Sequence, residues 1–180
     1  MNGNGDTRKA HKAMPQEDIR LRAVEHANIT QPLSTHEYME FSSHWYVVVY
    51  TEGSAFNTHC RYMARAGWSV WYADKSPFNV YSGLTGALQT SYRGELRATF
   101  HIFQTAGTPT WIKCDCKSVV DLANTILNDE ELDVAELTDG DLWQKLQRLA
   151  ASHRKDFFRI PWIPSHYDLF RRSEEVISSL

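Results

Sequence analysis

The chain has 180 residues, of which 42% are hydrophobic and 23% are charged, and this near-average composition excludes a chain that is disordered throughout. The formal net charge is −3, so an anionic partner must be bound by local basic clusters or through a bound cation. No apolar run is long enough to span a bilayer, and the N-terminus lacks the hydrophobic segment of a secretory signal. We therefore expect an intracellular protein, cytoplasmic or nuclear, that has no membrane partner and is not secreted.

The first 43 residues are expected to form an N-terminal extension that is partly disordered. Residues 1–14 are rich in Gly, Asn and Lys and have no hydrophobic periodicity, which is typical of a disordered segment. Residues 15–28 begin with Pro and two acids in a first turn and continue with apolar residues, which predicts a short helix. The rest of the extension is expected to pack on the following domain or to link it to an upstream one.

An apolar run from Tyr46 to Ser54, YVVVYTEGS, is expected to be the central strand of a sheet. Its β-branched and aromatic residues do not alternate with polar ones, and the run is too short for an amphipathic helix, so it is typical of a strand buried on both faces. The run stops at Glu52, and Gly53 is expected to turn the chain outward. Open sheets with parallel strands bind ligands at such strand ends, which makes Glu52 a candidate for chemistry.

Two further strands and a helix are predicted next. Residues 64–73 and 78–83 alternate in the manner of strands, so the first three strands are expected to form an antiparallel meander. Residues 92–105 place apolar side chains every three or four positions, which predicts a helix with one buried side.

A second candidate acid follows the next predicted strand. Residues 110–115 predict a strand that ends at Asp115, and residues 118–127 predict a helix. The order strand, helix, strand implies a right-handed crossover and a parallel pair of strands. The parallel partner would be the first strand, which would place Asp115 beside Glu52.

The remaining elements are a loop, a helix and a strand. Residues 128–138 are acidic and predict a loop, and a helix is expected to open at Asp139. Residues 157–163 predict a last strand, and Pro161 favours a place at a sheet edge or strand end.

The three cysteines show no disulfide or zinc pattern. Cys60, Cys114 and Cys116 cannot all pair, and the C-x-C spacing of the last two along one strand is poor for a mutual disulfide. The nearest histidines, His59 and His101, have no recognisable zinc-ligand spacing with them. We expect a reduced setting.

Three carboxylates are expected to converge at one end of the sheet. Glu95 enters the first turn of its helix facing the sheet, and Glu52 and Asp115 end the two parallel strands. Converging acids repel one another unless they are protonated or bind a cation, and oxygen ligands suit Mg²⁺ or Mn²⁺. Such a site, open to phosphate oxygens, can activate water for an in-line displacement at phosphorus.

Six segments occur in the order found in one protein family. They are YTEGSAFN (50–57), RAGWSVWY (65–72), QTSYRGEL (89–96), CDCKSVV (114–120), DLWQKL (141–146) and WIPSH (162–166). Through them the chain resembles the ribonuclease H family. The resemblance implies an α/β protein of ribonuclease H-like fold, with a five-stranded mixed sheet and helices on both faces. It also implies that the acids bind two metal ions, Mg²⁺ or Mn²⁺, and that the protein hydrolyses the RNA strand of RNA–DNA hybrids.

Matched by position, the resemblance implies a catalytic set in this chain. Glu52, Glu95 and Asp115 correspond to three metal ligands. His166 corresponds to a loop histidine that helps water to enter or product to leave.

Two positions differ from the family pattern. Glu52 stands where the family almost always has Asp, and Val176 stands where the family has a final Asp. Asp168 is our candidate for the last metal ligand, with Glu174 and Glu175 as further stand-ins.

The resemblance also implies residues that bind the hybrid. Small polar groups that would reach the backbone and the 2′-hydroxyls are Asn57, Gln89, Thr90 and Ser91, and cations that would meet phosphates are Arg93 and Lys117. A basic run resembles the substrate-handling region of the family and would supply salt-dependent affinity; it comprises Arg148, His153, Arg154, Lys155 and Arg159.

Each candidate also has a purely structural explanation. Glu52 could be a solvated residue at a strand end, Glu95 could be favoured by the helix dipole, and Asp115 could cap the following helix. His166 could be an exposed loop residue, and the basic run could be a solvated helix face. The tryptophans are expected to pack in the core or at its rim and not to stack on bases.

We expect a single ribonuclease H-like domain over residues 44–168, followed by a divergent or truncated tail over 169–180. The leading function is metal-dependent endonucleolytic cleavage of RNA in hybrids. One alternative is a catalytically impaired module that binds nucleic acid or has a structural role, and another is a related DNA nuclease of the same superfamily. The lead-in and the divergent tail suggest a piece of a larger polyprotein, such as a retroelement reverse transcriptase.

Overall fold

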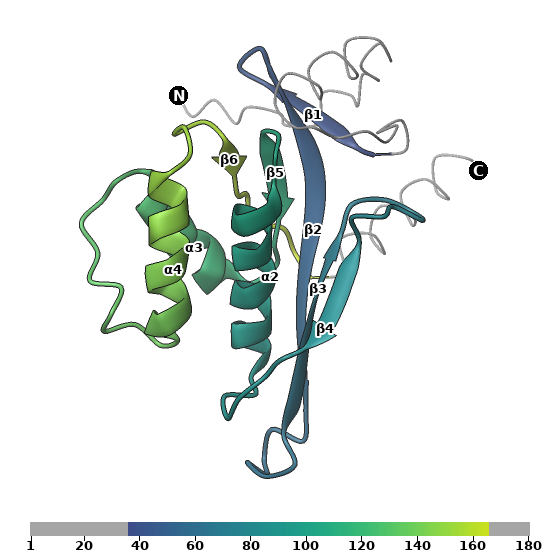
Figure 1. Cartoon of the computed structure of the whole chain (residues 1–180), viewed down its shortest axis with the longest axis vertical. Helices are drawn as coiled ribbons and strands as arrows, with labels where there is room; N and C mark the ends of the chain where they lie inside the picture. The colour runs from purple at the N-terminus through teal and green to yellow at the C-terminus, as the bar shows by residue number, and fades with distance from the viewer. Residues whose placement is uncertain (1–35, 166–180) are drawn as a thin grey trace, which may run out of the picture.

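The computed structural model describes residues 36–165, which fold into one mixed β-sheet with helices packed against it (Figure 1). The strands are β1 (Tyr38–Phe41), β2 (His44–Phe56), β3 (Arg65–Trp71), β4 (Val80–Gly83), β5 (Thr110–Lys113) and β6 (Phe158–Arg159). The helices are α2 (Ser91–Thr105), α3 (Lys117–Leu127) and α4 (Gly140–Ala151). Hydrogen-bonded neighbours follow the order β4-β3-β2-β5-β6, and β1 pairs with β2.

The predicted central strand is confirmed as β2. It pairs antiparallel with β3 and parallel with β5, and its residues Val48 and Val49 are fully buried. The predicted meander is also confirmed, because β4 pairs antiparallel with β3. β2 is longer than predicted: it continues past Gly53 and stays paired with β3 as far as Phe56, which lies opposite Arg65. Glu52 therefore lies within the strand and not at its last residue.

The sheet has six strands and not the five that the resemblance implied, because β1 adds one strand beside β2. In this hairpin Phe41 lies opposite His44. Ser42 and Ser43 between them have φ angles of 49° and 63°, the left-handed conformation that a two-residue turn of type I′ requires. Serine is not a usual residue of this turn, so the sequence pattern did not reveal the hairpin.

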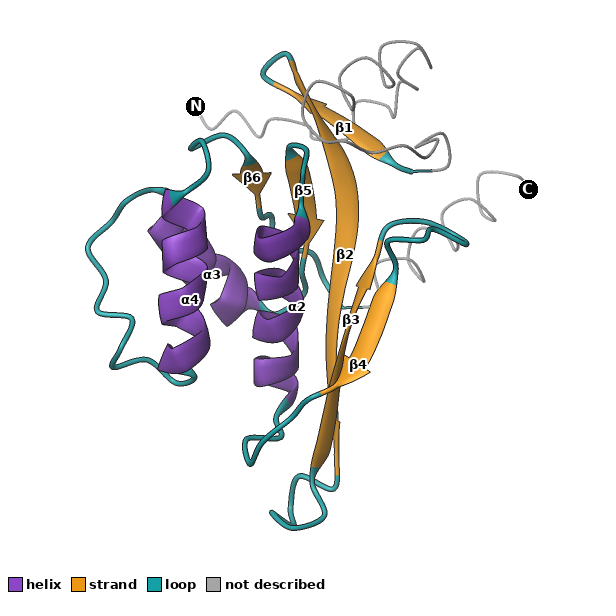
Figure 2. Ribbon diagram, viewed as in Figure 1, coloured by secondary structure: helices purple, strands orange, loops and turns teal. Residues whose placement is uncertain are grey.

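The helices of residues 36–165 all lie on one face of the sheet, whereas the resemblance implied helices on both faces (Figure 2). One continuous core joins this face to the three helices. Its members include Val49, Val70 and Ile112 from the sheet, Leu96, Ile102 and Phe103 from α2, Val119 and Ala123 from α3, and Trp143 and Leu146 from α4. The apolar periodicity of each helix segment predicted this buried side.

The last strand is shorter than predicted. β6 covers only Phe158–Arg159 and lies at the sheet edge, as Pro161 indicated. Proline has no N–H to donate to the ladder, and parallel pairing resumes only at a single bridge between Cys114 and Trp162.

The predicted disordered segment, the helix over 15–28 and the tail over 169–180 lie outside the described residues, and the domain limits stay predictions. Within residues 36–165, none of the helices combines the length and the apolar character needed to cross a membrane.

Candidate active site

Glu95 lies over the sheet where α2 approaches β2 most closely. The two elements meet through Gly53 and Gly94, and a Cβ on Gly94 would lie 2.5 Å from the carbonyl oxygen of Gly67. Only glycine allows this approach. The side chain of the next residue is thereby brought to β2: Glu95 is 4% exposed, and its carboxyl accepts a hydrogen bond from the Gly53 N–H. Glu95 lies in the second turn of α2 and not in the first, so the helix dipole explains little of its placement.

The surroundings of Glu95 favour its neutral form. The pKa of Glu95 is raised to about 7, chiefly by burial and then by the carboxylate of Asp115, with a smaller contribution from Glu52. The Gly53 N–H opposes this shift, because it stabilises the ionised carboxyl. The Cys114 thiol, whose pKa burial raises to about 12, lies 3.7 Å from the other carboxyl oxygen as a weak donor. Asp115 and Glu52 therefore both act electrostatically on Glu95.

Strand register places Asp115 level with Glu52. β2 and β5 run in parallel, and Tyr50 lies opposite Lys113, the last residue of β5. Glu52 follows two residues later within β2, and Asp115 follows two residues after the end of β5, which is two residues shorter than predicted. The backbone carbonyl of Asp115 accepts a hydrogen bond from the Trp162 indole at 2.8 Å. Asp115 does not cap α3, because the N-cap residue of that helix is Cys116. The parallel pairing predicted from the crossover is thus confirmed.

The chemistry of this donor set fits a hard divalent cation, although the side chains are not arranged as a finished metal site. Asp115 and Glu52 both raise the pKa of Glu95, and a bound cation would relieve the repulsion behind this shift. Among residues 36–165, no group of three or more His, Cys, Asp or Glu side chains is already placed to hold a metal ion.

A polar network that lies beside the acids was not predicted from the sequence. Lys113 is 6% exposed, and its ammonium donates to the Tyr50 hydroxyl at 2.9 Å and to the Glu37 carboxylate at 3.1 Å. The Tyr50 hydroxyl donates to the same carboxylate at 2.8 Å. Tyr50 precedes Glu52 by two residues within β2, so this network lies on the same face of the sheet as Glu52. The only sign of this network in the sequence is Lys113, a charged residue within the apolar run TWIKC.

Comparison with known proteins identifies the family. A family model described as RNase H matches residues 44–175. The chain belongs to the RNase H family. Two solved structures are similar to it. The PFV RNase H domain in solution has 19% identity and a TM-score of 0.48, over 66% of this chain and 79% of that chain. The foamy viral protease-reverse transcriptase in complex with dsDNA has 17% identity and a TM-score of 0.50, over 71% of this chain and 88% of that chain, and this likeness shows a shared fold. No curated protein matches.

In this RNase H chain, the Gln89 side chain forms hydrogen bonds with the backbone of neighbouring segments. Its amide oxygen accepts a hydrogen bond from the Ala66 N–H at 2.7 Å. Its amide nitrogen donates to the carbonyls of Leu84 and Gly86 at 3.1 and 2.8 Å. These bonds hold the loop between β4 and α2 against β3, so they compete with the predicted contact to the hybrid.

Thr90 and Arg93 also have partners within the chain. Thr90 is the N-cap of α2, and its hydroxyl accepts a hydrogen bond from the Arg93 N–H at 3.0 Å. The Arg93 guanidinium binds Asp139 and, through two nitrogens at 2.9 and 2.8 Å, Asp141 at the start of α4. The predicted phosphate contact of Arg93 would have to compete with two carboxylates.

The other predicted substrate residues are exposed. Asn57 follows β2 with a φ of 53°, and Ser91 is the first residue of α2. Lys117 pairs with Asp121 one turn along α3 at 2.8 Å, but the side chain is 69% exposed, so this pair is weak. These placements are compatible with the predicted contacts, which stay predictions.

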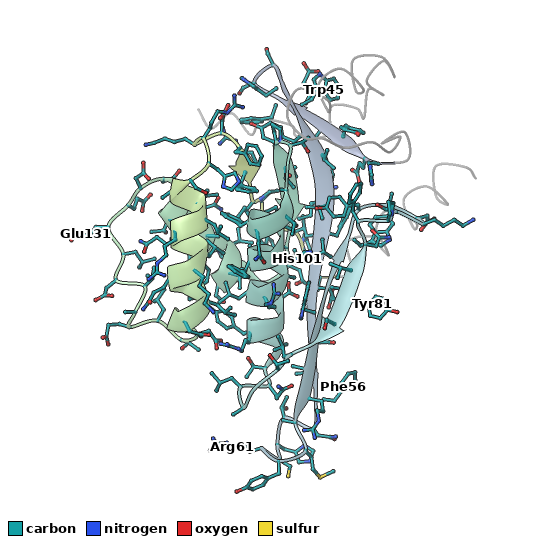
Figure 3. The ribbon with its side chains drawn as sticks, viewed as in Figure 1. Trp45, Phe56, Arg61, Tyr81, His101 and Glu131 are labelled. Carbon is teal, nitrogen blue, oxygen red and sulfur yellow. The ribbon has the colours of Figure 1, made fainter. Side chains whose placement is uncertain are left out.

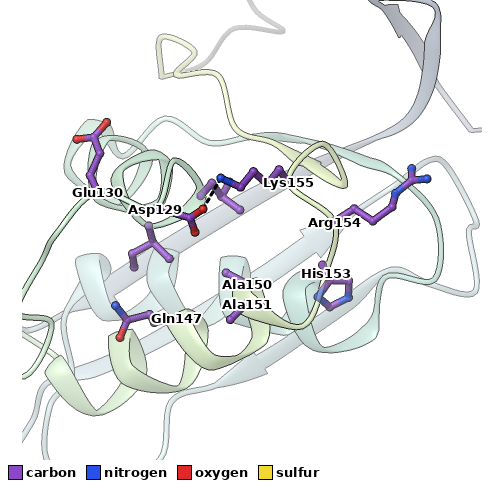
Figure 4. A pocket seen from close by; sticks show the side chains of 10 residues that line it. Asp129, Glu130, Gln147, Ala150, Ala151, His153, Arg154 and Lys155 are labelled. Carbon is purple, nitrogen blue, oxygen red and sulfur yellow. Dashed lines mark ion pairs between the residues drawn. The ribbon is translucent and has the colours of Figure 1, made fainter.

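The predicted basic run lies apart from the acids. Several of its members line a cavity of about 480 Å³ between the ends of α3 and α4, with no carboxylate of the candidate site in its lining (Figure 4). Lys155 binds Asp129 across this cavity, and Arg154 lies 3.4 Å from Asp156. Both cations are therefore partly neutralised, which favours the structural explanation for this run.

Two predicted members of the site, His166 and Asp168, lie outside the described residues, and their roles stay predictions.

Proposed function

We propose that this chain is a metal-dependent endonuclease that hydrolyses the RNA strand of RNA–DNA hybrids. Membership of the RNase H family supports a nuclease. The observation that carries the proposal is the buried carboxyl of Glu95, whose pKa is raised to about 7 with Asp115 and Glu52 among the causes. A carboxyl whose pKa is strongly perturbed by burial and by nearby charges is a candidate for a functional site.

The residues that would hold Mg²⁺ or Mn²⁺ are Glu52, Glu95 and Asp115, with Asp168 as the fourth candidate. When bound, two such ions would supply a water of lowered pKa and stabilise charge at the leaving oxygen. The chain contributes orientation: the Gly53 N–H fixes one oxygen of Glu95, and the close packing of α2 on β2 keeps this carboxyl out of bulk water. The predicted contacts of Asn57 and Ser91 to 2′-hydroxyls would select RNA.

A cleavage assay tests the proposal. A labelled RNA–DNA hybrid is incubated with the protein and Mg²⁺ or Mn²⁺, beside RNA and DNA duplexes of the same sequence. We expect cleavage of the RNA strand of the hybrid alone and no cleavage in EDTA. Asp115→Asn should lose this activity. Asp121→Asn, which changes an exposed acid on α3, is the matched control and should keep it. Intact cleavage by Asp115→Asn would show that the site assignment is wrong.

A second candidate function is a binding module with impaired catalysis. Glu52 in place of the family's Asp favours it, because the extra methylene moves the carboxyl oxygens by about 1.5 Å, which octahedral Mg²⁺ tolerates poorly. Hybrid binding without cleavage under either metal would support this candidate. Cleavage of the DNA duplex instead of the hybrid would support the DNA nuclease of the same superfamily.

We also propose that the domain acts within a larger polyprotein that contains a polymerase. The likeness in fold to the foamy viral protease-reverse transcriptase supports this context. Sequencing the gene on both sides of the region that encodes residues 1–180 tests it. An uninterrupted reading frame into a polymerase is the expected result, and a stop codon on both sides would contradict it.

A further inference from the structure

Tyr81 lies in the same cross-strand row as Glu52. Glu52 of β2 is opposite Ser69 of β3, and Ser69 is opposite Tyr81 of β4. Residues opposite one another project to the same face of a sheet, so all three side chains stand on the face without described helices. Two strand spacings, about 10 Å, separate Glu52 from Tyr81. Only the small Ser69 side chain stands between them.

The aromatic rings on this face are open to solvent. Tyr81 is 86% exposed, and Figure 3 shows its side chain directed away from the helices. Trp71, two residues beyond Ser69 on β3, is 41% exposed and is the diagonal neighbour of Tyr81 at about 7 Å. The Trp71 ring is held from its other side by Tyr50, with 5.5 Å between ring centroids. This face of the sheet therefore presents the packed ring of Trp71 and the exposed phenol ring of Tyr81, about 10 Å from the proposed catalytic acid.

The charge of this part of the chain suits a polyanion. Residues 53–83 include the last four residues of β2 and all of β3 and β4, and they contain three Lys or Arg residues and a single acid, Asp74. In contrast, the segment 128–141 beside α4 carries seven acids and no Lys or Arg. The net charge of −3 is therefore unevenly distributed along the chain. A nucleic acid is favoured on the sheet face over the α4 side, because the α4 side carries the excess of acids.

We infer that Tyr81 is a stacking platform for an unpaired base of the nucleic-acid strand that passes Glu52, with the packed Trp71 ring as its neighbour. Aromatic side chains on an open sheet bind splayed bases in this way, and stacking tolerates any base. One strand of a duplex advances about 3.4 Å per nucleotide, so the base on Tyr81 lies roughly three nucleotides from the phosphate at Glu52. The substrate class that fits is a hybrid flanked by a single-stranded extension. The inference rests on the proposed function, whose substrate it specifies.

A fluorescent base tests the platform without catalysis. The probe is an RNA–DNA hybrid with a single-stranded extension that carries 2-aminopurine within about three nucleotides of the duplex end, mixed with the protein in EDTA. Stacking on an aromatic ring quenches this fluorophore. We expect quenching with the native chain and with Tyr81→Phe, and loss of quenching together with roughly tenfold weaker binding in Tyr81→Ala. A blunt hybrid should bind the native chain and Tyr81→Ala equally.

Tyr62→Ala is the matched control, because Tyr62 is also a tyrosine and is 90% exposed, but lies in the loop between β2 and β3. It should keep the quenching. Undiminished quenching in Tyr81→Ala, or an equal loss in Tyr62→Ala, would overturn the inference. Quenching without any cleavage in Mg²⁺ or Mn²⁺ would sustain the platform and contradict the proposed function. Cleavage of the hybrid without quenching would support the proposed function and overturn the platform.

Discussion

Gly53 of β2 and Gly94 of α2 pack so closely that a Cβ on Gly94 would lie 3.0 Å from the Cα of Gly53. This contact joins the fold to the candidate site, because Glu95 follows Gly94 directly and receives the Gly53 N–H. Any side chain at either glycine would push the helix away from the strand.

Gly94→Ala should therefore destabilise the protein. The clash with the Gly67 carbonyl is expected to cost about 1–3 kcal/mol, and it is offset by up to about 1 kcal/mol from the higher helix propensity of alanine. Urea denaturation followed by circular dichroism measures the free energy of unfolding. Gly83→Ala is the control, since a Cβ there would meet nothing closer than 4.0 Å. Equal stabilities of the two variants would contradict the argument.

Glu95→Gln should stabilise the protein at high pH in the absence of metal. The pKa of Glu95 is raised from 4.5 to about 7 in the folded state, so the native protein holds a proton that the unfolded chain releases between these values. Stability from this group is therefore lost as the pH rises from 4.5 to 7. Glutamine cannot ionise, and we expect it to be more stable than glutamate by on the order of 3 kcal/mol at pH 8 and by little near pH 4.5.

Urea denaturation in EDTA at pH 5 and pH 8 measures this difference. Glu136→Gln, in the exposed loop before α4, is the control and should follow the native profile. Parallel profiles for Glu95→Gln and the native chain would show that Glu95 is not held in the neutral form.

Arg93→Met should cost about 3 kcal/mol of stability. It leaves the Asp139 carboxylate, whose side chain is 3% exposed, without its cation, and removing one partner of a buried pair is strongly destabilising. Lys117→Met removes a similar charge from an exposed pair with Asp121 and should cost less than about 1 kcal/mol. Thermal and urea denaturation compare the two variants. A larger loss of stability in Lys117→Met than in Arg93→Met would contradict the argument that the buried pair matters more.

Glu52→Asp should increase hybrid cleavage in Mg²⁺ by about tenfold, which corresponds to about 1.4 kcal/mol in the barrier. The shorter side chain withdraws the carboxyl by about one bond, and Mg²⁺ demands near-ideal geometry. Initial rates on a labelled hybrid at saturating Mg²⁺ measure the change. The gain should disappear in the double variant with Asp115→Asn. A rate equal to or below that of the native chain would show that the length of Glu52 does not limit catalysis.

Much of the fold could be predicted from the sequence because its signals are local. The uninterrupted run YVVVYT predicted a strand buried on both faces, and helical periodicity predicted α2 and α3 within one residue of their observed limits. The order of a strand, a helix and a strand predicted the parallel pairing of β2 and β5. That pairing already placed Asp115 level with Glu52.

What the sequence determined by itself was the identity of the elements and the faces they bury, since hydrophobic period depends only on neighbouring residues. Tertiary structure alone decided which long polar side chains remain available to bind a substrate. A competing partner, such as Asp139 for Arg93, comes from a distant segment of the chain. It also decided the β1 hairpin, the contact of Gly53 with Gly94 and the row that joins Glu52 to Tyr81. These features depend on register and on close approach between elements, which no local pattern encodes.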